Sequence, residues 1–199
     1  MPSNDKKATA PALTIVENVP LTSCSLLMYL KERGIPLDIA KQHARELYYR
    51  HRDKDYSAIG IPNDSDGFEV RNRYFKGTIG NKDVSTIPGP THRVFVFEGM
   101  FDFLSAQAML DGKIDGTVIV LNSVTMKDKA IEIIKELKPL TVELYRDNDN
   151  SGRALLVDFQ QALPEPTIVD WAKLYACCGD LNEWYVENQQ SKQSPRGRG

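Results

Sequence analysis

Carboxylates that follow two apolar segments carry the clearest chemical signal in the sequence. Glu98 directly follows the continuous apolar run Val94–Phe97, and Asp102 lies four residues further on. Asp147 and Asp149 follow a second apolar segment in the same way. If both segments are parallel strands of one sheet, these carboxylates meet at its carboxyl edge, which is where such sheets bind ligands.

Converging carboxylates repel one another unless a cation joins them. Their hard oxygen atoms suit Mg²⁺ or Mn²⁺, which can neutralise and orient phosphate groups. Asp180, beside Gly179, follows the last expected strand and extends the set. We therefore predict a divalent-metal site that handles phosphate groups of nucleic acid, formed by Glu98, Asp102, Asp147, Asp149 and Asp180.

Three other interpretations of these residues remain open at this point. An acidic residue at a helix start is often only a cap or a partner of the helix dipole. The Asp147–Gly152 segment, with Asp158 at the twelfth place, partly matches an EF-hand calcium loop. However, Leu140–Tyr145 before it indicates a strand, and Arg153–Phe159 indicates a helix where the loop should continue. Aspartyl phosphatases also place Asp-x-Asp after a strand, usually the first of the domain.

Helical and strand patterns alternate after Pro90. We expect strands at Val94–Phe97, Thr117–Leu121, Leu140–Tyr145 and Thr167–Val169, and helices at Phe101–Leu110, Met126–Leu137, Gly152–Leu163 and Asn182–Asn188. Strands that alternate with helices of about ten residues predict an α/β fold with a parallel sheet flanked by helices and right-handed crossovers.

The part of the chain before Pro90 has a different pattern and predicts a small N-terminal α+β cap. Helical patterns cover Ser25–Arg33 and Pro36–Leu47, and short strand patterns cover Leu47–His51, Tyr56–Ile61 and Gly67–Tyr74. The ends of the chain are polar. We therefore expect a flexible leader at 1–20, the cap at 21–89, the α/β domain at 90–188 and a disordered tail at 189–199.

Composition limits the class of protein. The net charge of the 199 residues is −2, so affinity for a phosphate backbone requires a local basic patch. Cys24, Cys177 and Cys178 lack the spacing of zinc ligands, so we expect no zinc site and a reducing, cytoplasmic location. No apolar run approaches the ~20 residues of a membrane span. P-loop and dinucleotide-binding motifs are also missing.

Two motifs resemble the Toprim domain, which bacterial DnaG-type primases, topoisomerases and some nucleases share. The first is VFVFEGMFD at 94–102, with Glu-Gly after a strand. The second is YRDNDNSGR at 145–153, with Asp-x-Asp after a later strand. Both occur in the order and at the strand-helix spacing of that fold. The resemblance therefore implies a Toprim-like sheet with the acidic residues at its metal site.

Further residues are most similar to the catalytic core of DnaG-type primases, and a plasmid or mobile element is one origin that we consider for such a chain. FEGMFDFLS at 97–105 places an Asp three residues after Glu-Gly, as primases do. YLKERGI at 29–35 resembles the helix that opens the primase core. The segment 179–183 resembles the late acidic element of primases, except that Asn182 stands where they have an acidic residue, which puts its metal role in question.

The primase resemblance also implies where template and nucleotide bind. FEVRNRYFKG at 68–77 resembles the basic edge between cap and Toprim domain that holds both in primases. Phosphate contacts are the usual role of such basic residues. The candidates for nucleic-acid and NTP binding are therefore Arg71, Arg73, Lys76, Lys82, Asn122 and Arg153.

Taken together, the resemblance implies a primase-like nucleotidyltransferase that makes RNA primers on single-stranded DNA from NTPs. It implies Mg²⁺ or Mn²⁺ as cofactor, and a replicative helicase or a separate zinc-binding domain as partners. The catalytic residues implied are Glu98, Asp102, Asp147 and Asp149. Two alternatives stay open: a Toprim-type nuclease, and a non-catalytic module that binds single-stranded DNA during replication or mobilisation.

Overall fold

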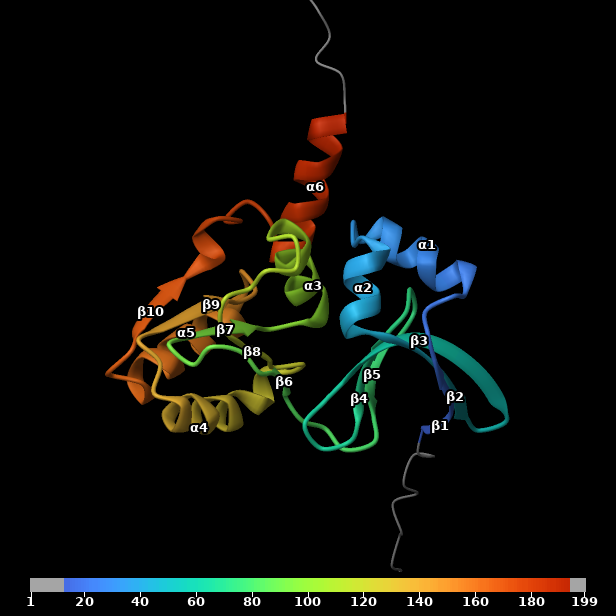
Figure 1. The fold of residues 1–199 in the computed structure, drawn as a ribbon, viewed down its shortest axis with the longest axis horizontal. Helices are drawn as coiled ribbons and strands as arrows, with labels where there is room; N and C mark the ends of the chain where they lie inside the picture. Colours follow the sequence, from blue (N-terminus) through green and yellow to red (C-terminus); the bar gives the residue numbers. More distant parts are fainter. Residues whose placement is uncertain (1–12, 194–199) are drawn as a thin grey trace, which may run out of the picture.

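An antiparallel sheet forms the first half of the fold in the computed structural model, which describes residues 13–193 (Figure 1). Its strands lie in the order β1-β2-β3-β4-β5, and each neighbouring pair is antiparallel. Helices α1 and α2 are inserted between β1 and β2. The bounds are β1 Thr14–Val19, α1 Cys24–Glu32, α2 Leu37–His43, β2 Arg45–His51, β3 Lys54–Pro62, β4 Phe68–Arg71 and β5 Lys76–Ile79.

A mostly parallel sheet forms the second half. Its order is β10-β9-β7-β8-β6, in which β6 pairs antiparallel with β8 and the other pairs are parallel. The prediction of an α/β fold with a parallel sheet flanked by helices is confirmed. The bounds are β6 Ser85–Ile87, β7 Arg93–Phe97, α3 Met100–Met109, β8 Thr117–Val120, the short helix η1 Val124–Met126, α4 Lys127–Leu137, β9 Thr141–Tyr145, α5 Asn150–Ala162, β10 Thr167–Asp170, η2 Trp171–Lys173 and α6 Leu181–Gln193.

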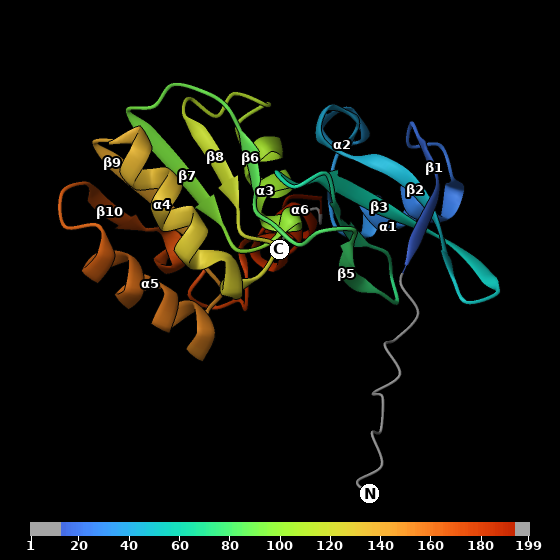
Figure 2. The same ribbon diagram turned by 90° about the horizontal axis from the view of Figure 1, so that it is seen from below.

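Helices cover both faces of the parallel sheet (Figure 2). Helices α4 and α5 pack on one face through a core that includes Ile134, Leu155 and Phe159. Helices α3 and α6 lie on the opposite face, toward the antiparallel sheet. The core on that side also includes Leu30 and Ile39 from α1 and α2, so it joins the two halves. Burial on both faces explains the continuous apolar runs 94–97 in β7 and 118–120 in β8.

Several boundaries differ from the expectations. Residues 14–19, expected in a flexible leader, form β1, because Ile15 and its neighbours pair with β2. Helix α2 ends at His43 rather than Leu47, because the residues from Arg45 on pair with β3 as strand β2. Strand β6 precedes the expected boundary at residue 89 yet belongs to the second sheet. Helix α6 continues past residue 188 to Gln193. The rest of the expected leader and tail, 1–12 and 194–199, lies outside the described residues.

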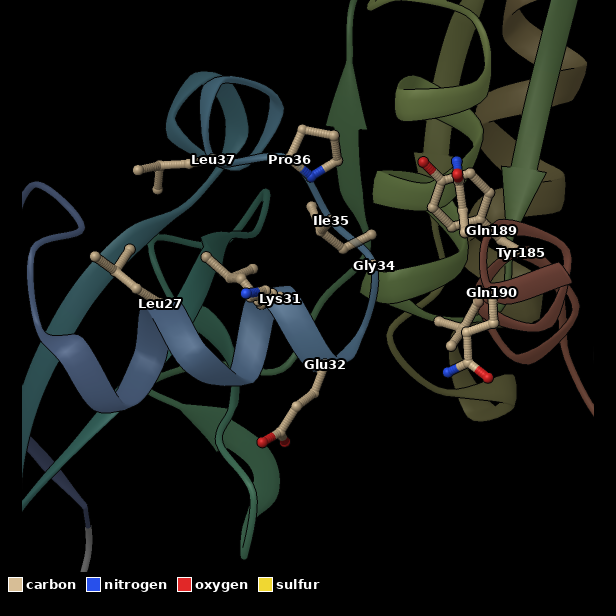
Figure 3. Close-up of a pocket in the computed structure, with 12 residues that line it drawn as sticks. Leu27, Lys31, Glu32, Gly34, Ile35, Pro36, Leu37, Tyr185, Gln189 and Gln190 are labelled. Atoms are coloured by element: carbon tan, nitrogen blue, oxygen red, sulfur yellow. The ribbon is translucent and has the colours of Figure 1, made fainter. Parts of the chain in front are cut away.

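A groove of about 670 Å³ separates α1 and the start of α2 from α6 (Figure 3). Apolar side chains such as Leu27, Leu37 and Tyr185 line it. Gly34 has a positive φ of 70° at the turn between α1 and α2, a conformation that costs glycine little. In the part of the chain described, no helix has the length and apolar character needed to cross a membrane.

Phe103 links the two halves of the fold and gives a stability prediction. Its ring is fully buried and lies 4.8 Å from His43 of α2 and 5.8 Å from Phe97 of β7, centre to centre. We expect Phe103→Ala to lower the free energy of unfolding by about 3–5 kcal/mol in denaturant titrations, because it leaves a cavity. Leu110→Ala, at a position that is 44% exposed, is the matched control and should cost less than about 1 kcal/mol.

Candidate metal centre at the carboxyl edge of the parallel sheet

Glu98 and Asp147 are neighbours because their strands pair. Phe97 at the end of β7 pairs with Tyr145 at the end of β9. Beyond that pair, the Glu98 amide donates to the Tyr145 carbonyl (3.2 Å), and the Asp147 amide donates to Glu98 Oε2 (3.0 Å). The two carboxylates predicted from separate segments are therefore held at one edge of the sheet.

Asn148 holds the loop between β9 and α5. Its side-chain amide donates to three carbonyls of the segment before α6, those of Tyr175 (2.8 Å), Cys178 (2.9 Å) and Ala172 (3.4 Å). Its backbone amide donates to the Gly179 carbonyl (2.7 Å). The loop that carries Asp147 and Asp149 is thus fixed to a segment more than twenty residues away and cannot move independently of it.

The start of α5 positions Asp149 and excludes the calcium-loop interpretation. Asp149 caps the helix by accepting a hydrogen bond from the Gly152 amide (2.8 Å). A side chain at Gly152 would meet the Asp147 carbonyl at 2.0 Å, so the turn requires glycine. A strand precedes this loop and a helix begins at Asn150. An EF-hand loop would need a preceding helix and a longer loop.

Asp102 and Asp180 extend the acidic set toward α6. Asp102 is buried in the first turn of α3, and its Oδ1 accepts a hydrogen bond from the Asn182 amide (3.1 Å). Asp180 Oδ1 accepts from the Glu183 amide at the start of α6 (2.6 Å). The charge of Asp180 raises the pKa of Asp102, after burial as the main cause. The charge of Asp180, just before α6, therefore acts on Asp102 in α3.

Asn182, where primases have an acidic residue, ties three elements together. Its side-chain amide donates to the Arg33 carbonyl and to Ser105 Oγ, both at 2.8 Å. It therefore connects α6 with the end of α1 and with α3. The sequence left its part in metal binding in question, and the structure gives it a structural role.

Negative charge is concentrated at Asp147. Burial, followed by the charges of Glu98 and Asp180, raises the pKa of Asp147 to about 7. Asp149 adds to this shift, whereas Lys76 opposes it. Lys76 comes from β5 of the other sheet, so the first half of the fold supplies positive charge to the acidic edge of the second.

Glu98 and Asp102 also have raised pKa values. For Glu98, burial is the main cause, the Asp147 amide opposes it, and Asp149 raises the pKa further. For Asp102, the pKa lies well above the ordinary range because the carboxyl is buried, and the charges of Asp180 and Asp147 raise it further. The Asn182 amide and Arg33 compensate only in part. The neighbouring positive charges therefore do not offset the negative charge of these carboxylates.

The acidic edge suits a divalent cation in its chemistry. Its donors are all carboxylate oxygens, which Mg²⁺ and Mn²⁺ prefer, and a cation would supply the charge that the set lacks. Within residues 13–193, however, no three Asp, Glu, His or Cys side chains stand close enough together to hold a metal ion. Binding would have to draw the carboxylates inward, and the metal site stays a prediction.

A cleft of about 300 Å³ lies between the acidic edge and the antiparallel sheet. Lys76 and Thr78 of β5 line one side, and Glu98 and Asn122 line the other. Lys82, in the connection between the sheets, lines it as well and donates from Nζ to Thr125 Oγ1 (3.1 Å). Among the predicted binding residues, Lys76, Lys82 and Asn122 therefore share this cleft.

The other predicted binding residues are placed differently. Arg71 is half-buried, and burial lowers the pKa of its guanidinium although the charge of Asp102 opposes this. Arg73 instead pairs with Glu32 of α1 and lines a separate cleft. Arg153 donates to the Asn148 carbonyl (3.1 Å) and to an oxygen of Asn150 (2.5 Å), so its side chain lies along the start of α5. Their role in binding stays a prediction.

The sequence interpretation missed Arg33 and the structural role of Asn148. Arg33 lies with its Cζ 4.7 Å from the centre of the Phe101 ring and lowers the pKa of Asp102. Neither residue has a signal in the local pattern, because the partners of Arg33 and Asn148 come from distant parts of the chain. The RGI segment of the expected opening helix contains Arg33 but does not indicate this contact.

Comparison with protein families identifies the class of the second half. Residues 95–185 match the family described as Toprim-like. Residues 15–80 match a family described as a domain of unknown function (DUF8464). No curated protein matches the sequence. The chain therefore contains a Toprim-like domain preceded by a second domain that the family description leaves without a function.

Solved structures extend the similarity over both halves. The primase fragment of the bacteriophage T7 primase-helicase protein aligns with 96% of this chain and 80% of its own, at a TM-score of 0.58 and 18% identity. A bacteriophage T7 complex of lagging-strand DNA polymerase with primase domains of two gp4 subunits, bound to an RNA/DNA hybrid and dTTP, aligns over 88% of both chains at a TM-score of 0.58 and 16% identity. At this identity the likeness concerns the fold. The chain thus has a Toprim domain and the fold of a phage primase core.

The hydrogen bonds of Asn148 give a prediction about the acidic loop. We expect Asn148→Ala to lower the free energy of unfolding by about 2–3 kcal/mol, because three partly buried hydrogen bonds to backbone carbonyls are lost. Hydrogen exchange of the amides in 146–152 should rise with it. Asn150→Ala, which removes only a contact to exposed Arg153, is the control and should change stability by less than about 0.5 kcal/mol. Equal effects of the two changes would contradict the proposed anchoring.

The raised pKa of Asp147 predicts a pH dependence of stability. Its pKa of about 7 exceeds the unfolded value of 3.8, so the folded chain binds more protons between these pH values, and stability falls as pH rises through them. In chelator-treated protein at pH 8, Asp147→Asn should therefore be more stable than wild type, by about 1–2 kcal/mol after allowance for solvent screening. Below about pH 4, the Asp147 carboxyl becomes protonated in the folded and the unfolded wild type. Thermal unfolding should therefore show no gain in stability from Asp147→Asn at such pH values. A gain that is independent of pH would contradict the assignment.

Proposed function

We propose that this chain is a primase-like nucleotidyltransferase that synthesises RNA primers on single-stranded DNA, with Mg²⁺ or Mn²⁺ as cofactor. The observation that carries the proposal is the cleft in which Lys76 and Lys82 face Glu98 beside Asp147. Cations for phosphate binding and carboxylates for a metal thus come from the two sheets and meet at one place. The primase-like fold over both halves supports this assignment.

Each group in the cleft has a distinct part in the proposed reaction. Lys76 and Lys82 bind phosphates of the template and of the incoming NTP. Glu98 Oε2 is engaged by the Asp147 amide, which leaves Oε1 to accept a proton from the attacking primer hydroxyl or to contact a metal. Glu98, Asp147 and Asp149 would hold a divalent cation, which would supply positive charge to offset that of the triphosphate. Most of the rate enhancement then comes from positioning and charge neutralisation.

The metal would be held by the acidic edge. Asp147 and Asp149 lie on a loop that Asn148 anchors, so the fold sets their backbone positions relative to Glu98, while their carboxylates would have to move inward to bind the ion. Asp102 and Asp180 form the outer part of the site next to α6. The protein partners in this proposal are a replicative helicase or a separate zinc-binding domain.

Primer synthesis by wild type and Glu98→Gln tests the proposal. With single-stranded DNA, NTPs and Mn²⁺ or Mg²⁺, we expect wild type to make short RNA and Glu98→Gln to lose at least about 100-fold in rate, because the group acts on the reacting centre. Mn²⁺ titration should show weaker binding to this variant. Glu165→Gln is the control and should behave as wild type, because Glu165 lies between α5 and β10, near Leu140 before the start of β9 and thus at the opposite edge of the sheet.

The alternatives give different results in the same assay. DNA cleavage without NTPs, lost in Glu98→Gln, would indicate a Toprim-type nuclease instead. DNA binding that survives Asp147→Ala combined with Asp149→Ala, without any product even when a zinc-binding domain is added, would indicate a non-catalytic module. Equal Mn²⁺ binding by wild type and Glu98→Gln would show that the site is assigned wrongly.

A further inference from the structure

The connection between the two sheets contains a buried carboxylate. Residues 80–84 join β5 of the antiparallel sheet to β6 of the parallel sheet. Asp83 in this connection is only 3% exposed. Buried carboxylates are rare unless they are paired and hydrogen-bonded, since the charge loses its hydration. The partners of Asp83 therefore matter for how the halves of the fold are held.

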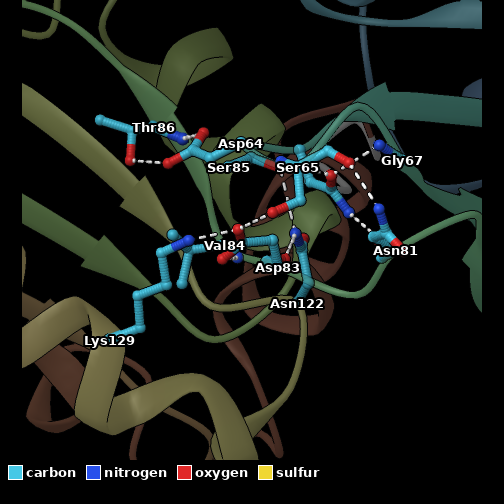
Figure 4. Close-up of polar contacts among 11 residues, drawn as sticks. Asp64, Ser65, Gly67, Asn81, Asp83, Val84, Ser85, Thr86, Asn122 and Lys129 are labelled. Atoms are coloured by element: carbon cyan, nitrogen blue, oxygen red, sulfur yellow. Dashed lines mark hydrogen bonds and ion pairs between the residues drawn. The ribbon is translucent and has the colours of Figure 1, made fainter.

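The carboxylate of Asp83 contacts both halves (Figure 4). Its Oδ2 accepts from Ser65 Oγ (2.5 Å), in the turn between β3 and β4, and from Lys129 Nζ in the first turn of α4. Its Oδ1 accepts from the Val84 amide (2.8 Å). Burial raises the pKa of Asp83, but Lys129, then Ser65, lower it more, so the net shift is downward and the carboxylate is ionised. It thus joins a turn of one sheet to a helix of the other.

The same turn holds the connection at a second point. Asp64 accepts hydrogen bonds from the amide and the hydroxyl of Thr86 (2.8 and 2.6 Å), and its own amide donates to the Val84 carbonyl (2.9 Å). From the parallel sheet, Asn122 donates to the Asp83 carbonyl and to Ser85 Oγ, both at 3.0 Å. Figure 4 shows these side chains converging on residues 83–86 from both sides.

The junction lies directly beside the candidate site. Lys82, the residue before Asp83, lines the cleft that contains Lys76 and Glu98. Asn122 lines that cleft and also binds the Asp83 carbonyl. A change in the junction would therefore move Lys82 and β5 relative to Glu98.

We propose that Asp83, through Ser65 and Lys129, is a positioning residue that fixes the basic edge of the antiparallel sheet over the acidic edge of the parallel sheet and so sets the affinity for the phosphate backbone. The inference rests on the proposed function of the cleft. In this inference, Asp83 contacts neither the substrate nor the metal and acts only through its neighbours. Its effect should appear in binding of template and nucleotide more than in the chemical step, since misplacement of phosphate contacts weakens binding.

Asp83→Asn in the full chain tests the proposal with three measurements. Amides of Asp64 and Val84 should exchange hydrogen about tenfold faster, as expected when a charge-assisted contact that closes the junction is lost. Affinity for a single-stranded oligonucleotide should fall by about fivefold to tenfold. In primer synthesis KM for NTP should rise by a similar factor, while kcat changes by less than about twofold.

Matched variants separate this effect from a loss of stability. Asp158→Asn removes another Lys–Asp pair, with Lys127, which lies between α4 and α5 on one side of the parallel sheet. It should leave exchange of 63–67 and 83–86, and oligonucleotide affinity, unchanged. Lys129→Met should reproduce Asp83→Asn, and the double variant should be no worse than either alone. If Asp83→Asn does not fold, the same three measurements are made on Ser65→Ala and Lys129→Met.

The outcomes distinguish this inference from the proposed function. Faster exchange with unchanged oligonucleotide affinity, or unchanged exchange in both Asp83→Asn and Lys129→Met, would overturn it. A wild type that binds oligonucleotide but makes no primer would overturn the proposed synthesis, while exchange and affinity still decide the role of Asp83. A wild type that binds no oligonucleotide would overturn both.

Discussion

The parallel pairing of β7 with β9 is the constraint on which the site depends. It aligns Phe97 with Tyr145 and so delivers Glu98 and Asp147 to the same edge, where a hydrogen bond joins them. The pairing is stable because both strands are buried between helices on their two faces. Hydrophobic burial thus holds together carboxylates that would separate if they were free to move.

The concentration of negative charge makes the two halves of the fold interdependent. The raised pKa of Asp147 reflects burial and neighbouring carboxylates, and Lys76 from the antiparallel sheet opposes it. Arg33, at the end of α1, does the same for Asp102. The first half of the fold therefore contributes positive charge to the acidic edge, and Asp83, in the connection between the halves, contacts Ser65 on one side and Lys129 on the other.

Strong local patterns account for the elements that could be predicted. The continuous apolar run of β7 and the helical spacing in α4 are set by burial, and both appear where expected. Strands β1, β5 and β6 were not predicted as such, because they are short or polar and depend on pairing with strands elsewhere in the chain. The same reason explains why α2 ends early: pairing of β2 with β3 overrides a weak helical preference.

The sequence by itself determined which acidic residues follow which strands, since the order of apolar runs, glycines and carboxylates is local. It also indicated the Toprim-like class that the family comparison confirms. Only the tertiary structure decided that Lys76 faces Glu98, that Arg73 pairs away from the cleft with Glu32, and that Asn182 ties α6 to α1 and α3. These contacts join residues far apart in the chain, and their geometry follows from how two sheets pack, which no local pattern encodes.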